Sequence, residues 1–274
     1  MKPGHQLFEL SMWGGAVERR YRKLRPEVEA LPWDSLDLSR SSPAAILAAR
    51  TTWTEAAFQE HRTGAACAAT LQALIAARAP IDLVAMASRF ALDEMVHVEL
   101  CARLAQRLGG GAPIAYDPAA IIVLPAPGLG VTLSAAELVV RNFCVGEALS
   151  IPILRGSWHA TKQPLIRAVL ARIVKDEAAH GAFGWIFLDW VEDQLSADDR
   201  VHLAKQAALT IDAVIDRWAT IPRVEDESPD QRLGWMDVKT YVELSRRSLR
   251  KVVLAPLLER GIDAAPWLTR SLDA

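Results

Sequence analysis

The fold is decided by Asp93-Glu94-Met95-Val96-His97 and Asp176-Glu177-Ala178-Ala179-His180, two segments with the same arrangement of side chains. In each segment a Glu and a His stand three positions apart, so an α-helix turns both toward one side. One helix can then offer a carboxylate oxygen and an imidazole nitrogen to a single metal ion. One such pair often arises by chance, whereas two copies, each preceded by Asp, indicate a paired metal site.

A further glutamate lies upstream of each segment. Glu60 is 34 residues before Glu94, and Glu147 is 30 residues before Glu177. The helical neighbours of all four glutamates are mostly apolar, so each carboxylate lies in a stripe that should face a core. Glu55 has polar neighbours, and we expect it to be solvated. Two helical hairpins of similar length with the same ligand set can pack as a pseudo-twofold four-helix bundle.

The remaining sequence predicts an all-α protein, because no window alternates as a strand would. Ser134–Glu137 has the pattern of a capping box, and Pro152 should kink the helix that follows it. The segment 111–133 is a connection rich in proline and glycine, and 222–236 is an acidic loop. The predicted helices cover about 43–77, 80–109, 134–157, 164–194, 196–221 and 237–258.

These elements suggest three parts of the chain. We expect an N-terminal arm over 1–42 with one short helix near Val17–Leu24, and a four-helix di-metal bundle over 43–195. Two additional C-terminal helices over 196–274 should pack on the bundle. They either cover a pocket or form a dimer interface, and a homodimer is one arrangement that the sequence leaves open.

The composition excludes several classes of protein. The chain has 31 basic and 33 acidic residues, so neither a nucleic-acid surface nor a membrane surface is expected. The N-terminus lacks the features of a secretory signal, and the longest apolar run, 121–133, is too short and too interrupted to span a bilayer. The three cysteines are far apart within apolar patterns and predict reduced thiols in a cytoplasmic protein.

Four buried carboxylates would each cost several kcal/mol without compensation. Two divalent ions neutralise them, and mixed carboxylate and imidazole ligands favour iron or manganese over zinc. We therefore expect two iron ions, with manganese or a mixed manganese–iron pair as alternatives. Glu147 and one other carboxylate should bridge the ions, and Glu60 should be a terminal ligand. The six predicted ligands are Glu60, Glu94, His97, Glu147, Glu177 and His180.

Residues near the ligands have two interpretations each. Asp93 and Asp176 could each accept the distal N–H of the histidine on the opposite helix, or could form salt bridges with Arg89 and Arg172. Other neighbours could line a substrate pocket, although buried cysteines usually serve packing and glycines often allow close helix contact. The candidate pocket residues are Gly64, Cys101, Phe143, Cys144, Gly181 and Gly184.

The pattern Glu60, Glu94-x-x-His97, Glu147, Glu177-x-x-His180 resembles the ferritin-like di-iron carboxylate superfamily over about residues 43–195. Its members include rubrerythrins, ribonucleotide reductase small subunits, multicomponent monooxygenases and manganese catalases. Local sequence also resembles a group of bacterial ferritin-like proteins. Storage ferritins lack a histidine at the position of His180, and no tyrosine lies in the four core helices. The resemblance therefore disfavours iron storage and a stable tyrosyl radical.

The resemblance implies a non-haem di-iron oxidoreductase that activates dioxygen and oxidises a small organic substrate. A separate reductase would supply the electrons, since the chain has no nicotinamide or flavin motif. One alternative is a peroxide-detoxifying or metal-handling protein, including one similar to di-manganese catalases. Another is a non-enzymatic scaffold whose metal site stabilises the fold.

Overall fold

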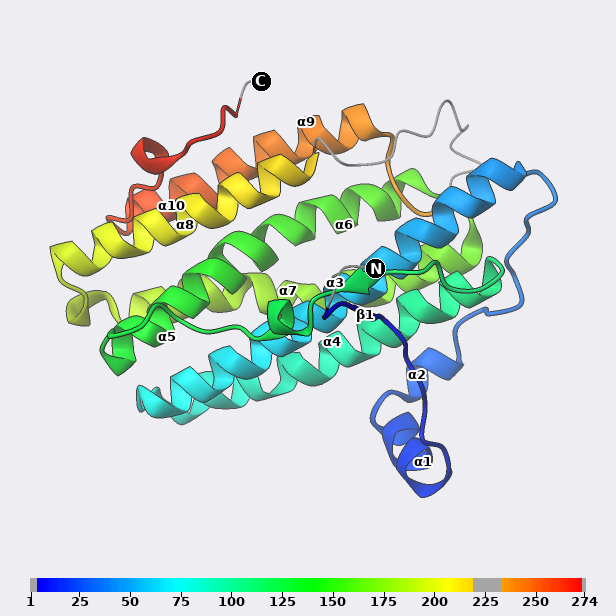
Figure 1. Cartoon of the computed structure of the whole chain (residues 1–274), viewed down its shortest axis with the longest axis horizontal. Coiled ribbons are helices and arrows are strands. Elements are labelled where there is room, and N and C mark those ends of the chain that lie inside the picture. The colour runs from blue at the N-terminus through cyan, green and yellow to red at the C-terminus, as the bar shows by residue number, and fades with distance from the viewer. Residues whose placement is uncertain (1–3, 219–232, 273–274) are drawn as a thin grey trace.

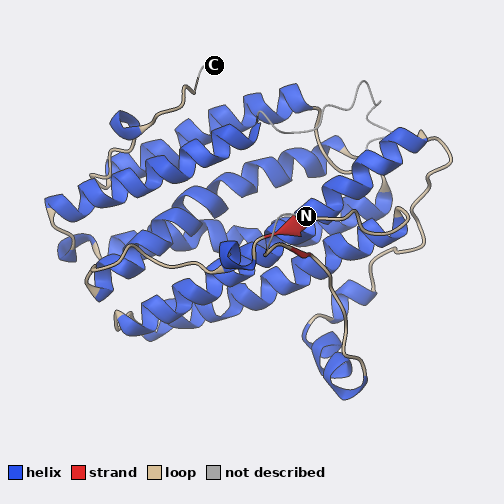
Figure 2. Ribbon diagram, viewed as in Figure 1, coloured by secondary structure: helices blue, strands red, loops and turns tan. Residues whose placement is uncertain are grey.

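The computed structural model describes residues 4–218 and 233–272, and these form an assembly of long helices (Figures 1 and 2). The predicted all-α fold class is confirmed. The described strands are a single antiparallel pair, β1 (Gln6–Leu7) and β2 (Ala115–Tyr116), which is too short to show as alternation in the sequence. Most of the loop predicted over 222–236 lies outside the described residues.

The bundle consists of two hairpins that lie side by side (Figure 1). The first comprises α3 (Pro43–Ala76) and α4 (Ile81–Arg107). The second comprises a long composite helix and α7 (Pro164–Trp190). The composite helix runs through α5 (Val131–Val139), the π-helix η2 (Val140–Glu147) and α6 (Ala148–Ala160).

The other elements flank this bundle on opposite sides (Figure 1). On one side lie α1 (Gly15–Leu24) and α2 (Pro26–Glu29), and η1 (Pro118–Ile121) belongs to the connection between the hairpins. The C-terminal elements are η3 (Glu192–Gln194), α8 (Ala197–Trp218), α9 (Val238–Ser248), the π-helix η4 (Leu249–Leu254), α10 (Ala255–Glu259) and η5 (Ala265–Trp267).

Side-chain caps fix several of the predicted helix starts. The Ser42 hydroxyl accepts from the Ala45 N–H at 3.1 Å, and the Asp237 carboxylate accepts from the Thr240 N–H at 2.8 Å. The predicted capping box at Ser134 is wrong. The helix already begins at Val131, and Glu137 is buried inside it instead of serving its N-terminus.

The composite helix is distorted upstream of the position where we expected Pro152 to kink it. Pro152 lies inside α6, and the wide π-helical turns of η2 come before it. The second π-helix, η4, similarly precedes Pro256. A proline lacks the N–H that the helix needs and its ring presses on the carbonyl four residues earlier, so the preceding turns relax.

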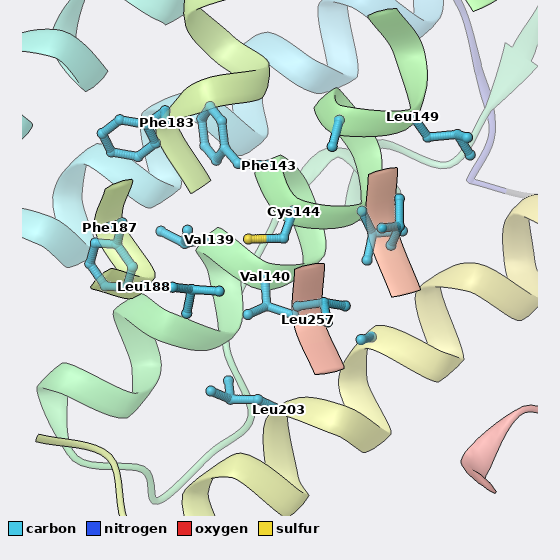
Figure 3. Packing of buried hydrophobic residues seen from close by; sticks show 14 of the residues in the cluster. Val139, Val140, Phe143, Cys144, Leu149, Phe183, Phe187, Leu188, Leu203 and Leu257 are labelled. Atoms are coloured by element: carbon cyan, nitrogen blue, oxygen red, sulfur yellow. The ribbon is translucent and has the colours of Figure 1, made fainter. Parts of the chain in front are cut away.

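The apolar core has two clusters, and the polar side chains at the centre of the bundle lie between them. The first cluster joins α5, η2 and α7 to the C-terminal helices (Figure 3). In it, the rings of Phe143 and Phe183 are 5.0 Å apart, and Cys144 packs nearby. The second cluster contains Trp53, Leu100 and the arm residues Val28 and Trp33. Among the described residues, no helix is both long enough and apolar enough to cross a membrane.

Glycine at position 184 permits the close approach of α7 and η2. A Cβ at this position would lie 2.7 Å from the Cys144 Sγ and 3.0 Å from the Phe143 Cβ. We therefore expect Gly184→Ala to lower the free energy of unfolding by about 1–3 kcal/mol through overpacking. Chemical denaturation measures this change. Gly146→Ala is the matched control, because its Cβ would meet its nearest neighbour at 3.6 Å, and equal destabilisation of both variants would contradict the explanation.

Candidate metal centre

All six side chains predicted as metal ligands converge at the middle of the bundle. Their ligand atoms form two groups, and within each group the atoms lie within 4.8 Å of one another. The first group contains Glu60, Glu94, His97 and Glu177. The second group contains Glu94, Glu147, Glu177 and His180. The helices α3, α4, η2 and α7 each contribute one carboxylate.

Glu94 and Glu177 are shared between the two groups. The Nδ1 atom of His97 lies 3.7 Å from Glu94 Oε2 and 3.3 Å from Glu177 Oε1. The Nδ1 atom of His180 lies 3.0 Å from Glu94 Oε1 and 3.5 Å from Glu177 Oε2. Each of these two carboxylates thus turns one oxygen toward each histidine, which is the geometry of a bridging ligand.

Glu60 and Glu147 occupy equivalent outer positions. Glu60 Oε2 is 3.9 Å from His97 Nδ1, and Glu147 Oε2 is 4.0 Å from His180 Nδ1. The expectation that Glu147 bridges the ions stays a prediction, and in this geometry each outer glutamate belongs to only one group. The reason is the packing of the helices. The two Glu-x-x-His helices, α4 and α7, face each other at the centre, while α3 and η2 flank them.

Burial and mutual repulsion shape the protonation of the cluster. Burial raises the pKa of Glu60 and Glu147 well above the usual range, and the charges of Glu94 and Glu177 add to this effect. Burial alone would lower the pKa of both histidines. The nearby carboxylates outweigh it, raising the pKa of His180 to about 12 and that of His97 well above its usual value.

The donor set fits a pair of divalent cations. Both oxygens of Glu94, one oxygen of Glu177 and the Nδ1 atoms of both histidines are buried without a hydrogen-bond partner among the described residues. Buried polar atoms normally find partners, so this concentration of unpartnered acceptors indicates a cation. Carboxylate oxygens and imidazole nitrogens together suit iron or manganese. The four glutamates and two histidines could hold two such ions.

Asp93 and Asp176 lie behind the histidines in a crossed arrangement. His97 Nε2, on α4, is 3.3 Å from Asp176 Oδ2 on α7, and His180 Nε2 is 3.5 Å from Asp93 Oδ2 on α4. The Asp176 carboxylate forms a hydrogen bond with His97 Nε2, which leaves Nδ1 for the centre of the cluster and fixes the orientation of the ring, whereas His180 Nε2 forms no hydrogen bond with Asp93. The aspartates also pair with Arg89 and Arg172, so both predicted roles occur together at Asp176.

The N-terminal arm contacts one side of this arrangement, which the sequence did not indicate. Arg172 donates to Glu27 of α2 at 2.8 Å and also pairs with Asp176. A chain of polar contacts thus runs from His97 through Asp176 and Arg172 to the arm. Arg89, its counterpart on the other side, has a side chain that is 68% exposed. The two halves of the cluster therefore differ in their outer contacts.

A large cavity meets the cluster from one side. It has a volume of about 2140 Å³, is lined by α3, the composite helix, α8 and α9, and is partly covered by residues 114–126. Glu60, Glu147 and Glu177 line it, whereas both histidines and Glu94 are fully buried. Its wall is more apolar than polar and includes Leu149, Ile153 and Leu154.

The residues expected to line a pocket mostly serve packing instead. Cys101, Phe143 and Cys144 are buried in the apolar clusters and do not line the cavity. Gly64 makes room for Met95, and Gly184 makes room for Cys144. Gly181 makes room for Ile151 and borders a separate, smaller pocket of about 480 Å³. Small residues here permit close helix contact, and the cavity forms on the α3 side of the cluster.

Glu137 lines the cavity, and its role could not be predicted from the sequence. Its buried carboxylate accepts from the Ala126 N–H at 3.2 Å and from Arg141 at 3.0 Å, and it lies 2.8 Å from His202 Nε2. These contacts hold the covering segment and α8 against the composite helix. The pattern of Glu and Arg four residues apart was the one available signal, and it did not reveal the distant partners.

The sequence matches no protein-family model and no curated protein. Among solved structures, the chain is similar to Protein 19, a protein with aldehyde deformylating oxidase activity from Synechococcus. The sequence identity is 18% and the TM-score is 0.52, and the match covers 80% of this chain and 98% of that chain. At this identity the likeness shows the fold alone, and it agrees with the helical bundle described above.

The sharing of ligands predicts how many metal ions each variant retains. We expect Glu94→Ala and Glu177→Ala to lose both ions, because each removes an oxygen from both groups. Glu60→Ala and Glu147→Ala should each retain about one ion. Mass spectrometry of iron-loaded protein measures the content per chain. Glu55→Ala is the control on α3, and equal losses in all four ligand variants would contradict the two-group geometry.

The aspartates behind the histidines predict that a substitution affects the metal affinity of one group more than that of the other. We expect Asp176→Asn to weaken metal binding at the His97 group by about 10- to 100-fold, because the imidazole loses the negatively charged acceptor that orients it. Binding at the His180 group should change much less. Competition with a chelator measures both affinities. Asp189→Asn is the control on the same helix, where the side chain is 61% exposed, and a uniform loss at both groups would argue against the crossed pairing.

Proposed function

We propose that this protein is a non-haem di-iron oxidoreductase that uses dioxygen to oxidise a small organic molecule. One observation carries the proposal: the buried cluster of four glutamates and two histidines opens through Glu60, Glu147 and Glu177 onto a large cavity whose wall is more apolar than polar. A substrate in this cavity would lie beside the metal ligands, and the fully buried side of the cluster would stay dry.

The residues of the chain have separable tasks in this proposal. Glu94 and Glu177 hold the two ions together, and the outer ligands Glu60 and Glu147 face the substrate space. Asp176 keeps the imidazole of His97 oriented through its Nε2 atom, and Asp93 lies behind His180. Two bound iron ions would supply the redox chemistry that dioxygen requires. An external reductase would supply the electrons.

The shape of the site favours this function over its rivals. A peroxide-detoxifying manganese protein needs only space for a small polar molecule, whereas the cavity exceeds the 300–1,000 Å³ or so of common ligand pockets. A purely structural metal site would be closed on all sides, yet three of the carboxylates line the cavity. The structurally similar protein has an aldehyde deformylating oxidase activity, so straight-chain aldehydes are suitable first substrates to test.

Oxygen consumption by ferrous-loaded protein tests the proposal. We expect the parent and Glu55→Ala to consume dioxygen with a chemical reductant, to do so faster with decanal present, and to convert the aldehyde. Glu94→Ala should consume none above the background of free iron. An oxygen electrode follows the uptake and mass spectrometry follows the product. Rapid disproportionation of hydrogen peroxide by manganese-loaded protein, with no aldehyde conversion, would instead establish the manganese alternative.

A further inference from the structure

The two Glu-x-x-His segments belong to a longer duplicated pattern, in which an arginine lies four residues before each aspartate. Residues 89–97 and 172–180 both have the order Arg-x-x-x-Asp-Glu-x-x-His. Within each helix the arginine pairs with the aspartate one turn later, and this aspartate faces the histidine of the other helix. The bundle therefore contains two copies of one arrangement, and the contacts around each copy distinguish them.

The two arginines differ in their surroundings. The side chain of Arg172 is only 13% exposed, and its Nε and Nη2 atoms donate to Glu27 Oε1 of α2 at 3.0 and 2.8 Å. The side chain of Arg89 is 68% exposed and pairs with Asp93 on its own helix. A guanidinium that donates to two carboxylates is fixed in position and has its charge offset, whereas an exposed one with a single partner is less constrained.

The arm that carries Glu27 is also bound to the first hairpin. Arg25, which is fully buried, donates to Glu99 of α4 at 2.7 Å, and Glu99 lies two residues after His97. Glu27 contacts α7 instead, one turn before Asp176. The arm thus spans α4 and α7 at the place where the histidine of one hairpin meets the aspartate of the other.

The two histidines differ in the same sense as the arginines. His97 Nε2 forms a hydrogen bond with Asp176 Oδ2 at 3.3 Å, whereas His180 Nε2 is buried without a hydrogen-bond partner, 3.5 Å from Asp93 Oδ2. The aspartate that the arm holds through Arg172 is therefore the one that orients an imidazole. An imidazole that is already oriented loses less conformational freedom when a metal ion binds, so it binds the ion more tightly.

The charge of Glu27 acts in the same direction as its hydrogen bonds. The Asp176 carboxylate is shared between the guanidinium of Arg172 and the imidazole of His97. The negative charge of Glu27 offsets the positive charge of the guanidinium, so more of the negative potential of Asp176 acts on the imidazole. Repulsion between the guanidinium and a bound cation is reduced as well.

From this comparison we propose that Glu27 and Arg172 are positioning residues of the metal centre, and that the metal position at His97 binds a divalent cation more tightly than the position at His180. The two ions then bind in order, with the position at His97 filled first. The inference rests on the proposed function only for the presence of two metal ions, since neither their binding nor its order requires oxidation of a substrate.

Titration calorimetry with Co²⁺ measures the two positions one at a time. Glu147→Ala keeps the group of His97 intact, and Glu60→Ala keeps the group of His180 intact. We expect Co²⁺ to bind Glu147→Ala at least about tenfold more tightly than Glu60→Ala. Adding Glu27→Gln should weaken binding to Glu147→Ala by about twofold to fivefold and leave binding to Glu60→Ala unchanged.

Two further variants complete the test. Glu27→Asp keeps the negative charge and should restore part of the affinity, and Glu9→Gln, at an exposed glutamate of the arm outside α2, should change neither position. Equal affinities of the two single-position variants would overturn the inference. An equal effect of Glu27→Gln on both positions would also overturn it, because a purely structural role of the arm affects both alike. If Co²⁺ binds as expected but iron-loaded protein oxidises no substrate, only the proposed function fails.

Discussion

Four carboxylates gathered inside an apolar bundle are the constraint on which the rest of the structure depends. Coulomb repulsion at such short range is severe in a medium of low polarity, and it is relieved only by cations or protons. Burial raises the pKa of Glu60 and Glu147, and the neighbouring carboxylates raise the pKa of both histidines, so protons are favoured on these four groups. Two divalent ions would replace those protons. The apolar clusters on both sides then act as walls that keep the helices, and hence the ligands, at fixed positions.

The two hairpins are similar at the centre and different at the periphery. Each supplies one outer glutamate, one central glutamate and one histidine. The arm contacts the side of Asp176, through Arg172 and Glu27, and it is fixed to α4 by the buried Arg25, which donates to Glu99 at 2.7 Å. The cavity is lined by the outer carboxylates of both groups, Glu60 and Glu147, so the arm is the feature that distinguishes the two sides. Such asymmetry gives the two metal positions different surroundings, although their ligand sets are chemically the same.

The parts of the structure that depend on local spacing could be predicted from the sequence. The helix starts at Ser42 and Asp237, and the common face of Glu94 and His97, follow from residues within one turn of one another. The parts that depend on distant partners could not. Glu137 looked like half of a capping box because its real partners, Ala126 and His202, come from other segments. The shared positions of Glu94 and Glu177 could not be predicted for the same reason, since they depend on how α4 and α7 face each other.

The crossed pairs of Asp93 with His180 and Asp176 with His97 also constrain the order in which the molecule is made. Neither hairpin contains both an imidazole and the carboxylate that orients it, so no half of the bundle is a complete site. During synthesis the first hairpin leaves the ribosome before the second, and neither group of ligands is complete until the chain beyond His180 has emerged. Docking of the second hairpin brings Glu177 to both groups, so both metal positions depend on this one step.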